Sequence, residues 1–391
     1  MPTATESDKA SHVLSQERGD FSGWLMYHSV GVFPGQKEAI SEVLVRFASD
    51  WCAPNDRRWD TALGARSALL SRWANLIGVD SAHVFAASSV TDAFARFVDG
   101  LGERTLNGRK VLVAADCFPS LHFLLSGLAD RYGFTLVTVP LREGEAYVRD
   151  DDFTACWGAD VALAVVTWVS SLTSKRADLN ALSAHARSVG SLVAVDLTQG
   201  AGIIPFDVRA SNCDFACSTS LKWLCGVPGA GLAYVAPALL NGGGMTPAVR
   251  GWFSQEAPFN WDIERFSYAP DARRFDTGTP SVLPFIASAP GFDWVMGQPP
   301  GALRNQNLEL CHRIIEIVDE KGYRLVSPRD DTQRGGSVMA DVPSHLDVQH
   351  VVKTLAAHQI VVDSRGRSLR LSPGFSTSDD GIERLALALP K

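Results

Sequence analysis

The sequence lacks three features that would point to a membrane, a secretory pathway or a nucleic acid. No apolar run reaches the roughly 18 residues of a membrane span, and residues 1–18 are polar, without the apolar centre of a signal peptide. The net charge is −7, and lysine and arginine do not gather into a basic stretch. We therefore expect neither a membrane nor a nucleic-acid partner, and we expect residues 1–20 to form a flexible tail.

Cysteine is present but follows no pattern. The seven cysteines are an odd number, and no histidine stands close to the one dense group, Cys213, Cys217 and Cys225. Such a set is typical of reduced thiols in the cytoplasm rather than of a disulfide framework or a metal site. We predict a cytoplasmic protein without a bound metal.

From about residue 65 onward, apolar strands alternate with amphipathic helices. Residues 160–167 form one continuous apolar run, as expected for a strand buried on both faces of a parallel sheet. The apolar residues of 65–77 instead follow a helical spacing. Further strands are predicted at 84–87, 110–115, 192–196, 230–236, 337–341, 360–363 and 368–371, and helices at 177–189, 287–322 (one or two) and 346–358.

This alternation predicts an α/β protein with two domains. The large domain, residues 56–290, is expected to have three layers (α/β/α) around a mostly parallel sheet. The small C-terminal domain, residues 291–391, is expected to be α+β. We place an N-terminal segment that packs on the small domain at 21–55, and a long ordered loop at 241–280.

The most informative stretch is 214–229, which holds Lys222 between a Ser/Thr cluster that includes Thr219 and a glycine-rich turn. A lysine in that setting forms a Schiff base beside a phosphate site. Its apolar neighbours favour burial, which lowers a lysine pKa, over an ordinary surface position. Asp196 ends an apolar strand 26 residues earlier; such a carboxylate either holds a pyridinium nitrogen or caps the turn. Together the two residues predict pyridoxal 5'-phosphate (PLP) as cofactor.

Other positions fit the same cofactor, each with a structural alternative. Ser88 and Ser89 begin a helix after a short strand, where free N–H groups hold a phosphate, and either serine also suits a helix cap. Phe118 follows the strand at 110–115 and would stack on the cofactor ring, or else pack on the core. Gln199 stands three residues after Asp196 and would donate to the phenolic oxygen of the cofactor.

These elements, in this order, resemble class V of the fold-type-I PLP enzymes. The shared pattern is two phosphate serines, an aromatic residue, Asp-x-x-Gln, and a Ser/Thr-rich segment before Lys-x-x-x-Gly. The segment 274–280 (RFDTGTP) is similar to the RFExGTP motif, whose threonine, here Thr279, reaches the phosphate of the neighbouring subunit. The resemblance covers residues 24–388. It implies the fold-type-I PLP-dependent transferase fold and a homodimer with a shared active site.

Within that class, the motifs most resemble those of kynureninase. By that resemblance, Arg370 would hold the substrate α-carboxylate through a bidentate contact, His28 and Ser29 would contact the substrate, and Trp252 would reach the phosphate of the partner subunit. A strand residue in a salt bridge is the structural alternative for Arg370. The similar segments are 27–31 (YHSVG), 56–59 (DRRW), 118–122 (FPSLH), 251–253 (GWF), 327–336 (SPRDDTQRGG), 362–365 (VDSR) and 369–373 (LRLSP).

The sequence departs from kynureninase where the phosphate and the substrate would bind. Leu221 stands in place of tyrosine, Leu121 of aspartate, Gln199 of histidine and His28 of asparagine. The resemblance therefore implies a lyase or hydrolase that cleaves a C–C or C–S bond at the β-carbon of a non-standard L-amino acid. The alternatives are an aminotransferase, a decarboxylating, deaminating or epimerising relative, and a PLP-binding protein without turnover. No cysteine follows Cys311, which disfavours a desulfurase with a C-terminal nucleophilic thiol.

Overall fold

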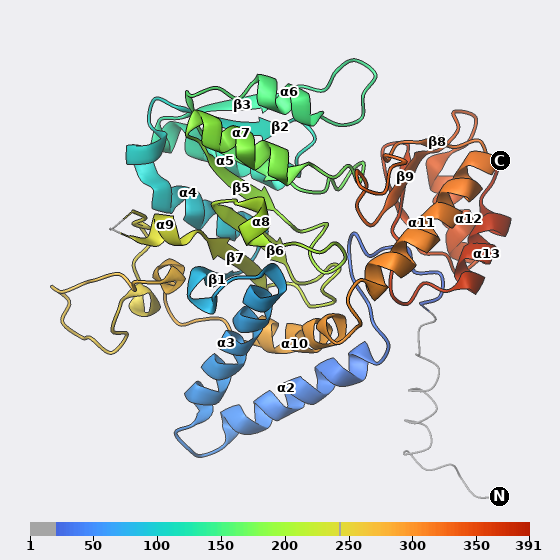
Figure 1. Ribbon diagram of the computed structural model, residues 1–391. Coiled ribbons are helices and arrows are strands. Elements are labelled where there is room, and N and C mark those ends of the chain that lie inside the picture. Colours follow the sequence, from blue (N-terminus) through green and yellow to red (C-terminus); the bar gives the residue numbers. More distant parts are fainter. Residues whose placement is uncertain (1–20, 242–243) are drawn as a thin grey trace, which may run out of the picture.

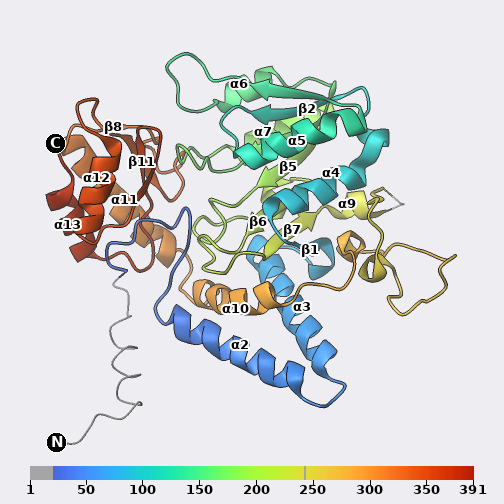
Figure 2. The same ribbon diagram turned by 180° about the vertical axis from the view of Figure 1, so that it is seen from behind.

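The computed structural model describes residues 21–241 and 244–391 (Figure 1). The tail predicted at 1–20 lies outside the described residues. A large sheet covered by helices stands beside a smaller sheet near the C-terminus, as the front and back views show (Figures 1 and 2). Among the described helices, none is both long enough and apolar enough to cross a membrane.

The large sheet has seven strands in the order β1-β7-β6-β5-β4-β2-β3. The pairs β3-β2, β2-β4, β4-β5 and β5-β6 are parallel, whereas β7 runs antiparallel to both β6 and β1. The sheet is thus mostly parallel, as the sequence predicted. The strands are β1 (Val84–Ala87), β2 (Lys110–Ala114), β3 (Thr135–Val139), β4 (Val161–Thr167), β5 (Leu192–Asp196), β6 (Phe215–Thr219) and β7 (Gly231–Val235).

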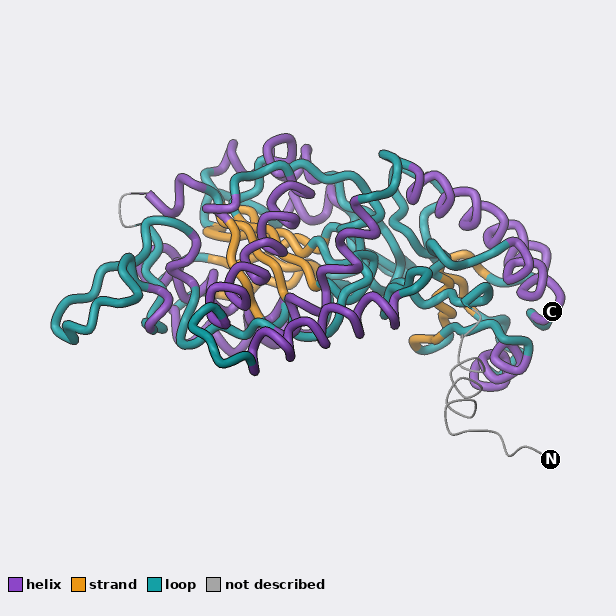
Figure 3. Tube along the Cα trace, turned by 90° about the horizontal axis from the view of Figure 1, so that it is seen from below, coloured by secondary structure: helices purple, strands orange, loops and turns teal. Residues whose placement is uncertain are grey.

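Helices cover both faces of this sheet and produce the predicted three layers (Figure 3). Side chains alternate along β4: Leu163 and Val165 enter a core with α4 and α5, whereas Ala164 and Val166 enter a core with α3, α7 and α10. The helical elements of this domain are α3 (Arg58–Ile77), η1 (Ser81–His83), α4 (Val90–Leu106), α5 (Pro119–Tyr132), α6 (Asp150–Ala155), α7 (Leu179–Val189), α8 (Val208–Ser211), α9 (Pro237–Leu240), η3 (Trp252–Ser254), η4 (Ala272–Phe275) and α10 (Leu283–Met296).

The small sheet is antiparallel and has the strand order β10-β11-β9-β8. Three helices pack on it around a separate apolar core that includes Ile314, Leu355 and Leu385. This arrangement is the predicted α+β domain. Its elements are α11 (Ala302–Glu320), β8 (Arg324–Leu325), β9 (Val338–Asp341), α12 (Val348–Ala357), β10 (Asp363–Arg365), β11 (Ser368–Leu371) and α13 (Asp379–Ala388).

The N-terminal segment predicted at 21–55 divides between the two sheets. Met26 forms a bridge with Ser372, and Leu25 is buried in the core of the small domain. Helix α2 (Gln36–Cys52) instead packs against α10 and α3. Because α10 is apolar around its circumference, it needs cover on its outer side as well. The prediction is therefore corrected for α2, which lies on the large domain.

Two predicted boundaries also move. The domain boundary at residue 290 falls inside α10, whose Phe292 and Val295 still belong to a large-domain core, so the chain leaves that domain only after this helix. The strand predicted at 360–363 begins at Asp363, because Val361 forms a bridge with Trp24 of the N-terminal segment instead.

The loop predicted at 241–280 contains a projecting segment, 249–268, which we call the arm (Figures 1 and 2). Its tip carries apolar side chains that are largely exposed: Phe259 (76%), Trp261 (79%) and Ile263 (94%). A patch of this kind is typical of a protein interface.

Candidate active site

Four of the predicted site residues lie at one edge of the large sheet. Asp196 ends β5 and Thr219 ends β6, and these two strands are parallel. Strand β1 runs in the same direction, since both β1 and β6 are antiparallel to β7, so Ser88 also follows a strand end at this edge. Phe118 comes after β2. In open α/β sheets, ligands bind at the carboxyl ends of the strands.

Asp196 is a buried carboxylate at the centre of this edge. The residue is 6% exposed, and one of its carboxylate oxygens accepts a hydrogen bond from the N–H of Thr198 at 2.9 Å. Burial raises the pKa of Asp196, while hydrogen bonding by Thr198 and the positive charge of Lys222 act in the opposite direction. The carboxylate is therefore poised to bind a cationic or N–H partner.

Lys222 lies in the turn after β6, partly buried, with its ammonium nitrogen 5.8 Å from the centre of the Phe118 ring. Burial lowers the pKa of Lys222 from 10.5 to about 8; the charge of Arg370 acts in the same direction and that of Asp196 opposes it. No carboxylate in the described parts of the chain forms an ion pair with this ammonium. A neutral, nucleophilic amine is thus accessible near physiological pH.

Two glycines allow the Lys222 turn to pack against the rest of the molecule. Gly31 donates its N–H to the carbonyl of Leu221 at 2.9 Å, and a Cβ at Gly31 would lie 1.8 Å from the carbonyl oxygen of Lys222. A Cβ at Gly291 would lie 2.3 Å from the carbonyl oxygen of Cys225. Backbone from the N-terminal segment and from α10 therefore fixes the turn on both sides.

The start of α4 shows the cap that was the alternative for its serines. Ser89 accepts a hydrogen bond from the N–H of Asp92 at 3.1 Å, and is the N-cap of the helix. Ser88 donates its N–H (2.8 Å) and its hydroxyl (3.0 Å) to the Asp92 carboxylate. A phosphate at this place would compete with that carboxylate for the same donors, so phosphate binding by the two serines stays a prediction.

Ser88 also lines a cavity that contains two arginines. The cavity, of about 310 Å³, is also lined by Thr279 and by the arginines Arg66 and Arg96. Each arginine is paired with an aspartate: Arg66 with Asp276 and Arg96 with Asp92. The structure thus brings Ser88 and Thr279 of one chain to the same cavity.

On the substrate side, Arg370 of β11 adopts the salt bridge that was its structural alternative. The Arg370 side chain is buried (8% exposed). Its Nε donates to one carboxylate oxygen of Asp363 at 2.7 Å, and its Nη2 donates to the other. Its Nη1 donates to the carbonyl of Ser171 at 3.4 Å.

His28 joins the same cluster and is almost fully buried (1% exposed). Its Nε2 lies 3.1 Å from an Asp363 oxygen, and its Nδ1 lies 2.7 Å from the Ser372 hydroxyl. Burial lowers the pKa of His28 below its ordinary value of 6.5, so the ring is neutral at physiological pH. The amide of Gln199 donates to the His28 carbonyl at 3.1 Å, a structural role that the sequence did not predict.

Two other predicted residues lie in different surroundings. Ser29 is partly exposed in a turn, where its N–H donates to the carbonyl of Met26 at 2.8 Å. Trp252 is on the arm, where its ring contacts the rings of Phe253, Phe259 and Trp261. Within one chain, Trp252 is therefore held by the arm itself.

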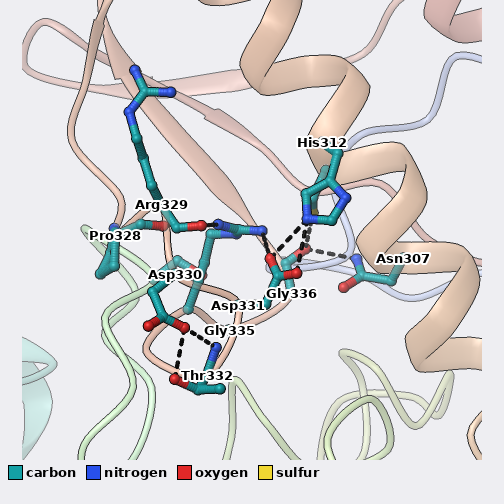
Figure 4. A network of polar contacts seen from close by, with 12 residues as sticks. Asn307, His312, Pro328, Arg329, Asp330, Asp331, Thr332, Gly335 and Gly336 are labelled. Atoms are coloured by element: carbon teal, nitrogen blue, oxygen red, sulfur yellow. Dashed lines mark hydrogen bonds and ion pairs between the residues drawn. The ribbon is translucent and has the colours of Figure 1, made fainter.

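The segment 327–336 supports the loop after β4 that reaches Arg370. On one side, the N–H of Gly335 donates to the carbonyl of Ser174 in that loop at 2.7 Å. On the other side, His312 of α11 pairs with Asp331 at 2.8 Å (Figure 4). This polar network ties the small domain to the edge of the candidate site.

Sequence reasoning missed Asp363 and Gly31. Asp363 lies in the segment 362–365 that was quoted for its resemblance, but no role was given to it. The sequence alone gives no signal that Asp363 pairs with Arg370. The two residues become neighbours only when β10 and β11 pair, because that register places Asp363 opposite Arg370. The signal for Gly31 was its place in the quoted segment 27–31.

The residues present fit PLP. A partly neutral Lys222 suits its aldehyde, the buried Asp196 carboxylate suits a pyridinium N–H, and the Phe118 ring suits a flat aromatic ring. Thr167, the residue beside Asp196 in the sheet, has a buried hydroxyl without a hydrogen-bond partner among the residues described here. Buried polar atoms are normally satisfied, which is consistent with a polar ligand at this edge.

Comparisons with known proteins agree with the fold and with PLP as the cofactor. The family model described as aminotransferase class-V matches residues 66–373. An uncharacterized aminotransferase of Bacillus subtilis is 26% identical over 81% of this chain and 81% of its own length. A kynureninase of Deinococcus radiodurans is 30% identical over 81% of this chain and 72% of its own length. Among solved structures, the apo cysteine desulfurase of Thermococcus onnurineus has a TM-score of 0.81 at 20% identity, covering 99% of this chain and 98% of that one.

Proposed function

The chain belongs to the aminotransferase class-V family of PLP-dependent enzymes, and on that premise we propose that it cleaves a C–C or C–S bond at the β-carbon of a non-standard L-amino acid. The observation that carries the proposal is Lys222: a partly buried amine, with its pKa lowered to about 8, beside a buried carboxylate and an aromatic ring. Similarity to kynureninase favours β-carbon cleavage.

Each residue of the cluster has a role in this proposal. When bound, PLP supplies an electron sink for the substrate α-carbon. Lys222 would bind the cofactor aldehyde and then move the proton of the α-carbon, Asp196 would hold the ring nitrogen, and Phe118 would stack on the ring. Arg370 would bind the substrate α-carboxylate, which fixes the bonds of the α-carbon relative to Lys222.

A substrate screen tests the reaction. PLP-loaded protein is incubated with L-kynurenine, 3-hydroxykynurenine, several S-substituted cysteines and common amino donors with a keto acid, and the products are read by mass spectrometry. We expect two fragments that arise from a break at the β-carbon, and no such products with the matched Lys222→Ala protein. A keto acid with the carbon skeleton intact, or an epimer of the substrate, would overturn β-cleavage.

Transamination is the second candidate, because one similar protein is named as an aminotransferase. The same screen separates the two, since transamination consumes the keto acid and leaves every C–C bond of the amino acid in place. A desulfurase is disfavoured. Cys311 is buried, burial raises its pKa to about 11, and no cysteine follows it in the sequence.

We also propose that the active unit is a homodimer in which Trp252 serves the partner's site. The exposed apolar tip of the arm supports this, since such a surface is stabilised when another chain covers it. A complementation experiment tests it: Lys222→Ala and Trp252→Ala proteins, each of which we expect to be inactive alone, are unfolded, mixed and refolded together. If Trp252 acts across the dimer, mixed dimers have one complete site and recover about a quarter of the wild-type activity.

If Trp252 acts within its own chain, every site in the mixture stays defective and no activity returns. The two proteins refolded separately are the control. A monomer by light scattering would contradict the dimer directly.

A further inference from the structure

We propose that Asp363 is a positioning residue: it holds the Arg370 guanidinium so that the terminal Nη1–Nη2 edge is presented to a substrate carboxylate. The inference rests on the proposed function, in which Arg370 binds that carboxylate. Through Asp363, an arginine that is already in a salt bridge still serves a substrate.

The Arg370 guanidinium has two edges that can bind a carboxylate, and Asp363 occupies one of them. Arginine has five N–H donors in a planar fork, with one bidentate edge on the Nε side and one at the terminus. Asp363 occupies the side edge, through Nε (2.7 Å) and Nη2. The carbonyl of Ser171 is a long 3.4 Å from Nη1. One carboxylate therefore fills one edge of the fork, and a second carboxylate would reach Arg370 at its terminal edge.

Asp363 is itself held in place by its hydrogen-bond partners. Its carboxylate accepts from Arg370 and from the Nε2 of His28 at 3.1 Å. Because a carboxylate only accepts, the neutral His28 ring carries its proton on Nε2, and its Nδ1 lies 2.7 Å from the Ser372 hydroxyl oxygen. The Ser372 hydroxyl lies 2.6 Å from that of Ser337. The chain of contacts anchors Asp363 to the N-terminal segment and to Ser337, the residue before β9.

A buried guanidinium without a partner is costly, so Arg370 needs Asp363 whenever no substrate is bound. A simple counter-ion would require only proximity. Asp363 instead meets three N–H donors in fixed directions, which is the arrangement that orients a side chain. Burial raises the pKa of Asp363, but hydrogen bonds from His28 and Arg370 outweigh burial and lower it, so the carboxylate is ionised.

The test is a ligand titration that separates the carboxylate from the rest of the ligand. L-Alanine, L-kynurenine and S-methyl-L-cysteine, and the carboxamide of each, are titrated into PLP-loaded protein while the cofactor absorbance is recorded. The variants are Asp363→Asn, Arg370→Lys and the double variant. Arg365→Ala is the matched control, because Arg365 also lies near Asp363 (3.6 Å) but is exposed.

We expect Asp363→Asn to weaken carboxylate binding at least about tenfold, the size of a lost oriented charge-assisted contact. Asparagine would turn N–H groups toward N–H donors of Arg370. Carboxamide binding should stay unchanged, which also shows that the variant is folded. The double variant should bind carboxylates no more weakly than Arg370→Lys alone, because Asp363 acts through Arg370, and Arg365→Ala should match the parent protein. Asp363→Glu, which restores a carboxylate, should recover part of the affinity.

Four results would overturn the inference. Asp363→Asn binding carboxylates as tightly as the parent, or more tightly, would make Asp363 a counter-ion that merely weakens binding. Equal losses for carboxylates and carboxamides would make its role structural. If Arg370→Lys leaves carboxylate binding unchanged, or if no amino acid alters the absorbance of the parent protein, the proposed function is wrong. The inference is then wrong as well, because it rests on the proposed role of Arg370.

Discussion

The cofactor side and the substrate side of the candidate site are built in different ways. The cofactor side, with Lys222, Asp196 and Phe118, comes from strand ends of one sheet and is fixed largely by backbone. The substrate side joins His28 to Asp363 and Ser372, which are more than 300 positions away in the sequence, through side-chain hydrogen bonds.

Substitutions on the two sides should therefore have different effects. On the cofactor side, geometry is set by the sheet, so a changed side chain removes chemistry and leaves the frame in place. On the substrate side, geometry is set by hydrogen bonds between side chains, so a changed side chain alters the affinity for the substrate and its orientation.

The largest effect is expected for Lys222→Ala. The variant should lose the absorbance of covalently attached cofactor and at least about 10⁴-fold in activity, because one residue supplies both the attachment and the proton transfer. Absorbance spectra and the product assay measure the two losses. Retention of the wild-type cofactor band would contradict the assignment of Lys222.

Asp196→Asn comes next. The variant should fold and bind PLP, but lose activity by about 10²–10³-fold, as when one preorganised electrostatic partner is removed. The loss should fall on kcat rather than on substrate KM, because Asp196 lies on the cofactor side. Steady-state kinetics measure kcat and KM separately. A change confined to KM would contradict the assignment of Asp196 to the cofactor side.

Gly31→Ala tests the junction of the two sides. The new Cβ would lie 1.8 Å from the Lys222 carbonyl oxygen, so the backbone must shift, at a cost of about 1–3 kcal/mol of unfolding free energy or more. Gly64→Ala is the control, since a Cβ on this glycine in the middle of α3 meets nothing within 4 Å and should stabilise by roughly 0.5–1 kcal/mol. Chemical denaturation measures both; equal stability of the two variants would show that the junction is loose.

The smallest effect is a pH midpoint. The neutral amine of Lys222 is the form that attacks the cofactor aldehyde, so the attachment of PLP to apo-protein should accelerate as pH rises through about 8 rather than through 10.5. Because the charge of Arg370 lowers this pKa, Arg370→Gln should move the midpoint upward. Stopped-flow absorbance from about pH 6 to pH 10 measures the midpoint. An unchanged midpoint in Arg370→Gln would show that the charge of Arg370 does not act on Lys222.

Much of the fold followed from the sequence because its signals are local. The apolar run of β4 and the cluster around Lys222 each lie within a few residues, so the mostly parallel sheet was predictable. The position of α2 was not predictable, because the sequence of an amphipathic helix does not indicate which surface it packs against. The pairing of Asp363 with Arg370 required strand register, which the sequence does not state. The tail at 1–20, the cytoplasmic location and the roles of the site residues stay predictions.

The most direct test of the central claim is to find which lysine carries the cofactor. PLP-loaded protein is reduced with borohydride, digested, and mapped by mass spectrometry. The structure predicts one modified peptide, with the pyridoxyl phosphate mass on Lys222. Modification of a different lysine, or none, would contradict the assignment of Lys222 as the residue on which the site is built.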